Sequence, residues 1–296
     1  MSKENKQSDA HIVDGAIINE SLIDYAVNAF PVLGSRSAVK KAIATERLKK
    51  NGHVARFGDR VKGGDRLELE HRNRPKPKTF KLDIETVYED DYLIIVNKPG
   101  GIAVNGNRYK TVENALAGTV RTKAEDALPQ PVATHRLDVP TKGLVILAKT
   151  KTALINMNKD FQEKKVQKTY VAVVHGQLAE KGTIEEPIKG KRAITEFECL
   201  KVVPSRNFGH FSLVKLYPVT GRTHQLRIHM SNRGHLVVGD KMYAKRQTTI
   251  LGKGMYLCAV SLRFQHPISG EEVYVEIPTP PRFLRLVDRE ENRFGQ

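Results

Sequence analysis

The chain contains 296 residues, which at roughly 100 to 200 residues per domain is enough for two folded units. Hydrophobic residues make up 40% of the chain and charged residues 28%, a globular composition that excludes a disordered or membrane-embedded protein. The 49 Lys and Arg residues outnumber the 33 Asp and Glu residues, so the formal net charge is +16. Such a surface favours a polyanionic partner.

The cysteines and the apolar runs indicate the compartment. Cys199 and Cys258 are too few and too widely spaced for a disulfide framework or a cysteine-based zinc site. No stretch approaches the ~18 consecutive apolar residues of a membrane helix, and residues 1–10 lack the apolar core of a signal peptide. We therefore expect a cytoplasmic protein without a membrane partner. Because no heptad or exposed apolar helix requires a partner chain, we expect a monomer.

The first 70 residues divide into a tail and a small domain. Residues 1–19 are polar and lack periodicity, which predicts a flexible tail. Residues 20–70 are predicted to form a small α/β domain of two helices and a small sheet. Ser35 or Ser37 can cap the second helix, and Asn51-Gly52 indicates a tight hairpin turn. Apolar residues recur at helical spacing in the first helix, at Leu22, Ile23, Ala26, Val27 and Phe30.

Basic side chains are concentrated in this small domain. Arg36, Lys40 and Arg47 are spaced i, i+4 and i+11, which places them on one side of the predicted second helix. Three such residues alone would indicate a solvated helix face, but further cations follow in the next loop, which favours a phosphate-binding surface. The predicted RNA-binding residues here are Arg36, Lys40, Lys41, Arg47, Lys49 and Lys50.

A basic, proline-containing stretch at residues 71–82 is typical of a stiff linker and marks the domain boundary. Residues 83–282 then form the larger domain, and residues 283–296 are expected to be a C-terminal tail. Several strand-like runs with few helices between them predict an α+β fold with a mixed, mainly antiparallel sheet. Strands are expected at 82–96, 141–148, 169–175, 194–203, 210–217 and 273–277, and helices at 112–120, 151–164 and 223–232.

Several kinds of chemistry have no visible site in the sequence. His224 and His229 are the one close histidine pair in a promising segment, but a spacing of five does not direct both side chains at one ion. Glycine-rich phosphate loops and a Gly-x-Ser-x-Gly elbow are absent. We therefore expect neither a metal nor another cofactor.

The segment His135-Arg136-Leu137-Asp138 precedes a Val-Pro-Thr-Lys-Gly turn and an apolar strand at 144–147. An Asp next to Pro and Thr often caps a turn through its carboxylate. A carboxylate at a rigid strand entrance, with arginines available to keep it ionised, also suits a nucleophile. Both interpretations of Asp138 are open on these residues alone.

The stretch HRLDVPTKGLVILAKT resembles the signature of the RluA-type pseudouridine synthases. Further runs resemble the other motifs of that family in the same order, at 88–101, 168–170, 221–240 and 257–271. The helix pair, hairpin and basic loop at about 20–70 resemble an RNA-binding module named after ribosomal protein S-four. The chain is therefore similar to an RNA-modifying enzyme with the pseudouridine synthase fold and an appended RNA-binding domain.

The resemblance implies a reaction and roles for particular residues. The family breaks the glycosidic bond of uridine in RNA, rotates the base and rejoins it through ring carbon five, without a cofactor. Asp138 then corresponds to the catalytic aspartate, which could add to the sugar, add to the base or remove a sugar proton. Tyr170 is expected to pack against the flipped base and accept the proton from ring carbon five; without the resemblance it would more often be a core strand tyrosine. Arg222 is expected to pair with Asp138 and hold it charged.

Arg136 has two interpretations of equal weight. It could fill the gap left when a uridine is extruded from stacked RNA, or it could contact a phosphate. Lys142 stands where the family more often has Ser, and its effect on the choice of target is open.

The expected partner is RNA, with large-subunit ribosomal RNA favoured because synthases with an S-four-like module often act there, and transfer RNA possible. The alternative function is a catalytically inactive RNA-binding factor of ribosome assembly, against which the retained Asp138, Tyr170 and Arg222 argue. An aspartate-dependent hydrolase ranks far behind, because neither paired carboxylates nor a metal set is visible.

Overall fold

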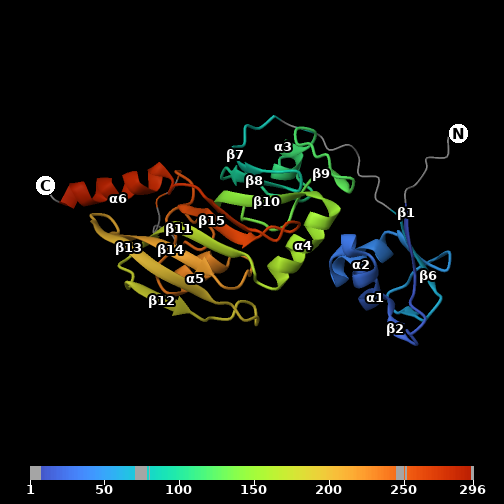
Figure 1. Ribbon diagram of the computed structural model, residues 1–296. Coiled ribbons are helices and arrows are strands. Elements are labelled where there is room, and N and C mark those ends of the chain that lie inside the picture. Colours follow the sequence, from blue (N-terminus) through green and yellow to red (C-terminus); the bar gives the residue numbers. More distant parts are fainter. Residues whose placement is uncertain (1–7, 71–78, 80, 245–249, 251, 295–296) are drawn as a thin grey trace. The chain divides into compact units, whose positions relative to one another are not determined.

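The computed structural model describes residues 8–70, 79, 81–244, 250 and 252–294. The chain divides into two compact units, Met1–Pro77 and Lys78–Gln296 (Figure 1). Most of the predicted linker, residues 71–82, lies outside the described residues. Within the described part of the chain, no helix has the length and apolar composition needed to cross a membrane.

Two helices cover the sheet of the first unit. Helix α1 (Leu22–Ala29) is followed by a 3-10 turn, η1 (Pro31–Leu33), and by helix α2 (Arg36–Ala44). Ser35 caps α2 by accepting a hydrogen bond from the backbone nitrogen of Ala38 at 3.2 Å. The predicted helix pair and one of its two predicted caps are therefore confirmed.

The strands of the first unit form two small sheets. One has the order β1-β6-β3-β4, and β2 pairs with β5 in the other. Asn51 and Gly52 have φ values of 51° and 79°, the left-handed conformation that a two-residue hairpin turn requires, so the predicted β3-β4 hairpin is confirmed. The strands are β1 (Ser8–Ile12), β2 (Glu20–Ser21), β3 (Leu48–Lys50), β4 (His53–Val54), β5 (Arg60–Val61) and β6 (Arg66–Glu70).

The predicted tail at residues 1–19 is wrong from residue 8 onward. Strand β1 pairs antiparallel with β6 from Ser8 opposite Glu70 to Ile12 opposite Arg66. The strand lies at the sheet edge with mostly exposed polar side chains, so backbone hydrogen bonds hold it and no hydrophobic alternation reveals it. The next residue, Val13, is buried in the core of this unit.

The second unit is built on a ten-stranded sheet. Eight strands have the order β12-β13-β14-β11-β15-β10-β8-β7, while β16 pairs with β15 and β9 with β10. Within the described residues only β10 and β15 are parallel, which confirms a mixed, mainly antiparallel sheet. The strands are β7 (Thr86–Glu89), β8 (Leu93–Lys98), β9 (Ala127–Ala133), β10 (Lys142–Thr150), β11 (Gln167–His175), β12 (Lys181–Ile184), β13 (Thr195–Ser205), β14 (Gly209–Pro218), β15 (Leu257–Gln265) and β16 (Glu272–Glu276).

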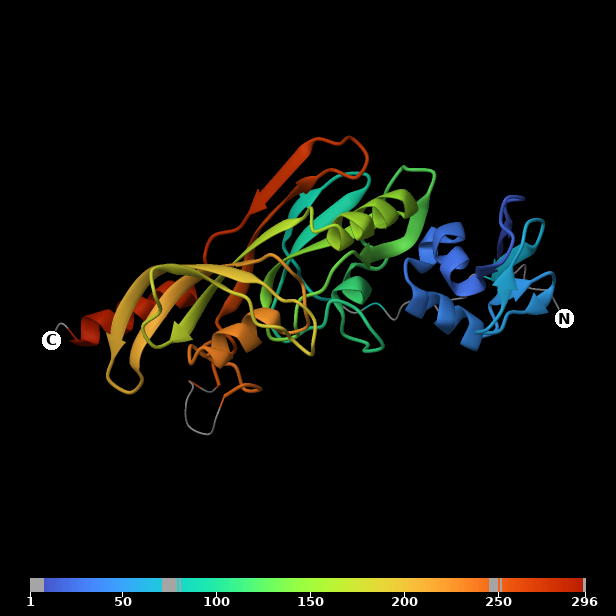
Figure 2. The same cartoon turned by 90° about the horizontal axis from the view of Figure 1, so that it is seen from below.

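Four helices cover the two faces of this sheet (Figure 2). Alternate residues of β11 show that both faces are buried, because Val171 and Val173 join one apolar cluster while Ala172 and Val174 join another. The first cluster includes side chains of α4 and α6, and the second includes side chains of α5. The helices are α3 (Val112–Leu116), α4 (Lys151–Gln162), α5 (Gln225–Asn232) and α6 (Pro281–Phe294).

The predicted C-terminal tail at 283–296 is wrong, because α6 extends to residue 294 and packs against β13 and β14. Phe283, Leu286, Val287 and Glu290 are buried at i, i+3, i+4 and i+7. Glu290 accepts a hydrogen bond from the Ser205 hydroxyl at 2.8 Å. Because many charged residues lie between these positions, the sequence pattern does not readily indicate the amphipathic helix. This helix belongs to the large domain.

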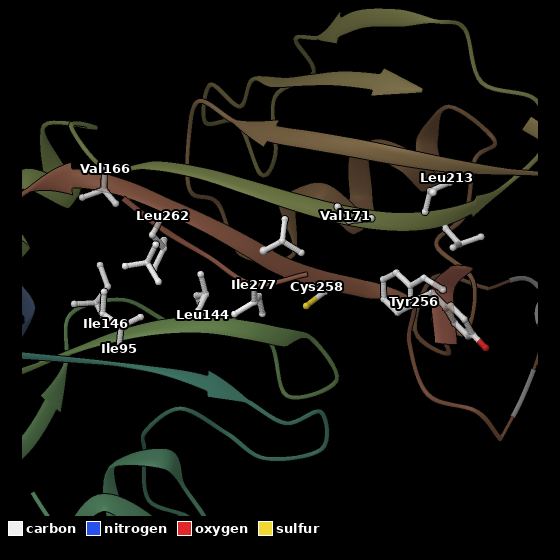
Figure 3. Packing of buried hydrophobic residues seen from close by; sticks show 14 of the residues in the cluster. Ile95, Leu144, Ile146, Val166, Val171, Leu213, Tyr256, Cys258, Leu262 and Ile277 are labelled. Carbon is white, nitrogen blue, oxygen red and sulfur yellow. The ribbon is translucent and has the colours of Figure 1, made fainter. Parts of the chain in front are cut away.

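The parallel contact between β10 and β15 joins the two halves of the sheet and is short. Its register is limited to Lys142 opposite Cys258 and Gly143 opposite Ala259. Beyond it, apolar side chains from both strands pack together, and Figure 3 shows Leu144 and Cys258 in this cluster. Gly143 has φ +112°, and a Cβ there would collide with the carbonyl oxygen of Ala259 and lie 2.6 Å from its nitrogen.

We expect Gly143→Ala to lower the free energy of unfolding of the large domain by about 2 to 5 kcal/mol. The left-handed backbone and the collision with Ala259 both contribute. Gly118→Ala is the matched control, because Gly118 has φ +81° with no atom within 4 Å of the added Cβ. It should cost only about 1 to 2 kcal/mol. Equal losses in calorimetric unfolding would show that the contact between the strands does not require glycine.

Candidate active site

A cavity of about 550 Å³ opens beside the loop that precedes β10. Its wall combines that loop with the end of α4, the start of β11 and the loop that precedes α5. Three residues predicted to be catalytic, Asp138, Tyr170 and Arg222, line it together with Arg136. The fold therefore gathers sequence motifs that are distant in the chain around one space.

The backbone of Asp138, rather than its carboxylate, forms the turn that enters β10. The carbonyl oxygen of Asp138 accepts from the backbone nitrogen of Thr141 at 3.0 Å. The next carbonyl, of Val139, accepts from the backbone nitrogen of Gly101 at 2.7 Å. The turn-capping interpretation is thus wrong, because no backbone nitrogen among the described residues donates to the carboxylate, which bonds to Arg227 instead.

A buried lysine supports this loop from behind. Lys98 is fully buried, and its ammonium group donates to the carbonyl oxygens of Pro99 and Ile102, each at 2.9 Å, and of Val139 at 3.3 Å. Burial lowers the pKa of Lys98 to about 8. Lys98 thus links the end of β8 to the turn that carries Asp138.

Arg227 in the first turns of α5 holds the carboxylate of Asp138. Its Nη1 donates to Asp138 Oδ2 at 2.9 Å, while its Nε and Nη2 donate to the two carboxylate oxygens of Asp240 at 2.6 and 2.8 Å. Burial opposes the charge on Arg227, but the hydrogen bonds to both carboxylates outweigh it and raise the pKa of the guanidinium. Burial likewise opposes ionisation of Asp240, but its bonds to Arg227 lower the pKa of its carboxyl.

The predicted pair of Arg222 and Asp138 does not form. The Nε of Arg222 donates instead to the backbone oxygen of Arg192 at 3.0 Å, although the residue lines the cavity. Arg222 precedes α5, whereas Arg227 lies inside it with only 4% of its side chain exposed. In the sequence, Asp240 is the residue that points to Arg227 as the buried arginine of the site. A buried guanidinium group needs a buried carboxylate as its partner.

The loop before α5 is held in place by Gln225. Its side-chain oxygen accepts from the Thr220 hydroxyl at 2.6 Å and from the backbone nitrogen of Arg222 at 3.0 Å. Its side-chain nitrogen donates to the Ile194 carbonyl at 2.8 Å. This glutamine therefore fixes the segment that leads into Arg227.

His224 and His229 face different surroundings. His224 lines the cavity with φ +58°, its Nδ1 is 2.9 Å from the Tyr243 hydroxyl and its Nε2 is 3.6 Å from Asp138 Oδ1. His229 is buried and bonds to Thr195 at 2.9 Å. Within the described residues, no three His, Cys, Asp or Glu side chains gather in an arrangement suited to a metal ion.

Tyr170 lies on β11, where it packs against two apolar clusters and lines the cavity. Burial and, to a lesser degree, the negative charge of Asp138 raise the pKa of Tyr170 well above its ordinary value. The phenol is therefore neutral near pH 7. Its hydroxyl has no hydrogen bond within the described part of the chain, so it is available to a bound molecule.

The predicted RNA-binding residues of the first unit differ in how they are engaged. Lys49 and Lys50 form ion pairs with Glu70 and Asp65 at 2.6 and 3.1 Å, and Arg36 pairs with Asp24. Lys40 and Lys41 are exposed on α2 and form no ion pair with residues that the structure describes.

The placement of Arg47 on the second helix is wrong. Helix α2 ends at Ala44, and Glu46 takes a left-handed φ of 55°, so Arg47 lies just before β3. Its guanidinium donates to the backbone oxygen of Glu70 at 3.2 Å. In the second unit, Arg136 is exposed on the cavity wall.

Comparison with known proteins gives consistent matches. A family model described as RNA pseudouridylate synthase matches residues 92–232. Ribosomal large subunit pseudouridine synthase D of Escherichia coli (strain K12) is 33% identical over 288 residues, covering 86% of each chain. An uncharacterized RNA pseudouridine synthase of Aquifex aeolicus (strain VF5) is 32% identical over 294 residues, covering 89% of this chain and 92% of the relative.

A solved structure also matches. Human RNA Pseudouridylate Synthase Domain Containing 1 superposes with a TM-score of 0.56 at 28% identity, covering 67% of this chain and 84% of that one. The relative from Escherichia coli covers more of this chain than the second unit alone contains, and the solved structure supports the mixed sheet as the family's fold. The chain therefore belongs to the RluA-type pseudouridine synthases, isomerases that convert uridine to pseudouridine in RNA.

Proposed function

We propose that this enzyme isomerises uridine in large-subunit ribosomal RNA and that Asp138 is its catalytic residue. The observation that carries the proposal is the carboxylate of Asp138, exposed to the cavity and fixed by Arg227 at 2.9 Å. The curated relatives from Haemophilus influenzae and Escherichia coli are named as large-subunit enzymes, which supports ribosomal RNA as the substrate.

The reaction needs few protein groups. The bond from the sugar to N1 breaks, a bond from the same sugar carbon to C5 forms, and one proton is transferred overall from C5 to N1. Atoms and electrons therefore balance without an oxidant or a cofactor. What the chain must supply is a carboxylate in fixed orientation and a cavity that holds the base while it turns.

Tyr170 and Arg136 fit supporting roles at this cavity. The neutral phenol of Tyr170 suits packing against the uracil ring, and its unbonded hydroxyl is placed to meet a group on the base. A role as acceptor of the C5 proton would require the phenol to lose its own proton first. Arg136 is exposed on the same wall and suits either the gap left in the RNA or a phosphate.

We infer that the first unit is an S-four-like RNA-binding domain, with Lys40 and Lys41 as its most available cations. Its two helices and small sheet carry a basic surface that suits the backbone of structured RNA. We further infer that the enzyme acts as a monomer in the cytoplasm, as fits its similarity to bacterial enzymes. The inactive assembly factor is not favoured, because the Asp138–Arg227 pair lines a cavity of sufficient size.

We expect Asp138→Asn to abolish isomerisation, with a loss of at least ~10⁴-fold in single-turnover rate, while RNA binding changes less than threefold. The amide keeps the size of the side chain but removes its charge and nucleophilicity. The measurement is release of tritium from RNA labelled at C5 of uridine, with ribosomal and transfer RNA assayed separately. Release from transfer RNA alone would overturn the proposed substrate.

Arg227→Lys should lower kcat by about 10- to 100-fold, because one ammonium group cannot hold Asp138 and Asp240 in the geometry of the guanidinium. The control is Arg222→Lys, which should leave kcat within threefold because Arg222 does not touch Asp138. Single-turnover rates at saturating RNA measure both. A larger loss in Arg222→Lys would restore the pairing predicted from the sequence.

The double variant Lys40→Gln/Lys41→Gln should reduce the slope of log Kd against log salt by about 1.4 to 1.8 for large structured RNA, as expected for two lost phosphate contacts. Arg36→Gln is the control, since Arg36 is already paired with Asp24 and should have a smaller effect. Filter binding between 50 and 300 mM salt, a range of about sixfold, gives the slopes. An unchanged slope in the double variant would remove this helix from the RNA interface.

A further inference from the structure

The cavity wall carries more positive charge than its carboxylate requires. Arg227 is shared by Asp138 and Asp240, so this buried cluster has a formal charge of −1. Four other cations line the same cavity, namely Arg136, Lys164, Lys168 and Arg222. A wall with this surplus of positive charge is suited to an anion, and two of the four cations, Lys164 and Lys168, lie between the end of α4 and Tyr170.

Lys168 is a cation on this wall that is partly buried and has no carboxylate partner among the described residues. It lies two residues before Tyr170 on β11, which corresponds to about 7 Å along the backbone of a strand, and both residues line the cavity. Its ammonium group is 5.7 Å from the centre of the Phe161 ring. Within the described residues it has no ion pair and no hydrogen bond.

The neighbours of Lys168 do not compensate its charge. His135 stacks on Phe161 at 4.7 Å between ring centres, and its Nε2 accepts from the backbone nitrogen of Ile146 at 3.0 Å. Burial, followed by the positive charge of Lys168, lowers the pKa of His135 to about 3, so the ring is neutral. The neutral imidazole and the phenyl ring interact only weakly with the partly buried ammonium group. These interactions do not replace the hydration that the group loses on burial.

A neighbouring lysine shows the contrast. Lys165 is exposed and pairs with Glu163 at 2.6 Å, and this bond raises its pKa. Burial alone lowers the pKa of Lys168, because no carboxylate opposes it. An anion that entered the cavity would relieve this cost, which points to a ligand rather than to a role in stability.

We propose that Lys168, assisted by Lys164, forms a subsite for one phosphodiester group of the RNA strand beside the flipped uridine. The inference rests on the proposed function, because it takes Tyr170 as the position of the base. Because Lys168 and Tyr170 line the same cavity, a strand whose uracil packs on Tyr170 brings its flanking phosphates to the wall that carries Lys168. Lys164 follows the end of α4 and lines the cavity with its side chain unpaired in the described part of the chain.

The test uses the full-length protein with Asp138→Asn in every sample, so that binding is measured without turnover. We expect Lys168→Met to raise the Kd for a ribosomal RNA fragment about tenfold and to reduce the salt slope by about 0.7 to 0.9, as for one lost phosphate contact. Lys168→Arg should restore both. Lys165→Met is the matched control and should change neither, because that charge is paired with Glu163 outside the cavity.

A single uncharged methylphosphonate linkage locates the contact. Placed next to the target uridine, it should weaken binding to the enzyme with Lys168 but not to Lys168→Met, and placed four nucleotides away it should weaken both equally. An unchanged salt slope in Lys168→Met, or equal weakening at both positions, would overturn the subsite and leave the lysine a packing residue. Should Lys168→Met fold poorly, as judged by its unfolding temperature, Lys164→Met with the same linkages distinguishes the same two outcomes.

Failure of the subsite and failure of the proposed function are separable. Tritium release by the enzyme with Asp138 intact reports the reaction, whereas the salt slope reports phosphate binding. Normal release from ribosomal RNA with an unaltered slope in Lys168→Met would reject the subsite alone. Salt-sensitive RNA binding without release would reject the reaction alone.

Discussion

The site depends on one guanidinium shared by two carboxylates. Arg227 spans from Asp240, which is fully buried, to Asp138, whose side chain is 16% exposed. These three charged groups can be buried together only because the guanidinium group donates to both carboxylates. A lone buried charge would destabilise the folded state by several kcal/mol. The buried carboxylate of Asp240 anchors Arg227, and Arg227 in turn orients the carboxylate of Asp138 that lines the cavity.

The sheet fixes the positions of the cavity residues relative to one another. Asp138 precedes β10, Tyr170 lies on β11, and both strands are adjacent to β15. The parallel contact of β10 with β15 is confined to two residue pairs, and a glycine is required where the backbones approach. Lys98 ties the turn before β10 to the end of β8. The loop of Asp138 is thus held from two sides, as precise orientation of a reacting group demands.

Apolar periodicity predicted the helix pair and the mixed sheet but missed β1, at a sheet edge, and α6, whose buried positions are separated by many charged residues. The helix pair of the first unit and the mixed sheet follow from apolar spacing, whereas β1 is held by backbone bonds at a sheet edge. In the site, Asp138 and Tyr170 were predicted from motifs. The motif predicts Arg222 as the partner of Asp138, because a linear motif does not show that Arg227 lies inside the helix, near a buried acid 13 residues further on. That information is three-dimensional.

Net charge likewise does not tell where a polyanion binds. In the first unit Arg36, Lys49 and Lys50 are engaged with carboxylates, so their charge contributes to the excess of +16 but little to phosphate binding until those pairs open. Lys168 adds one charge to the same total, yet it is partly desolvated and without a counter-ion in the described part of the chain. An anion that binds a cation must displace either water or an existing carboxylate partner from it. Cations without a carboxylate partner therefore contribute more per residue to the affinity for a polyanion. On the subsite proposed for Lys168, a few unpaired side chains contribute more to RNA binding at the cavity than the overall charge does.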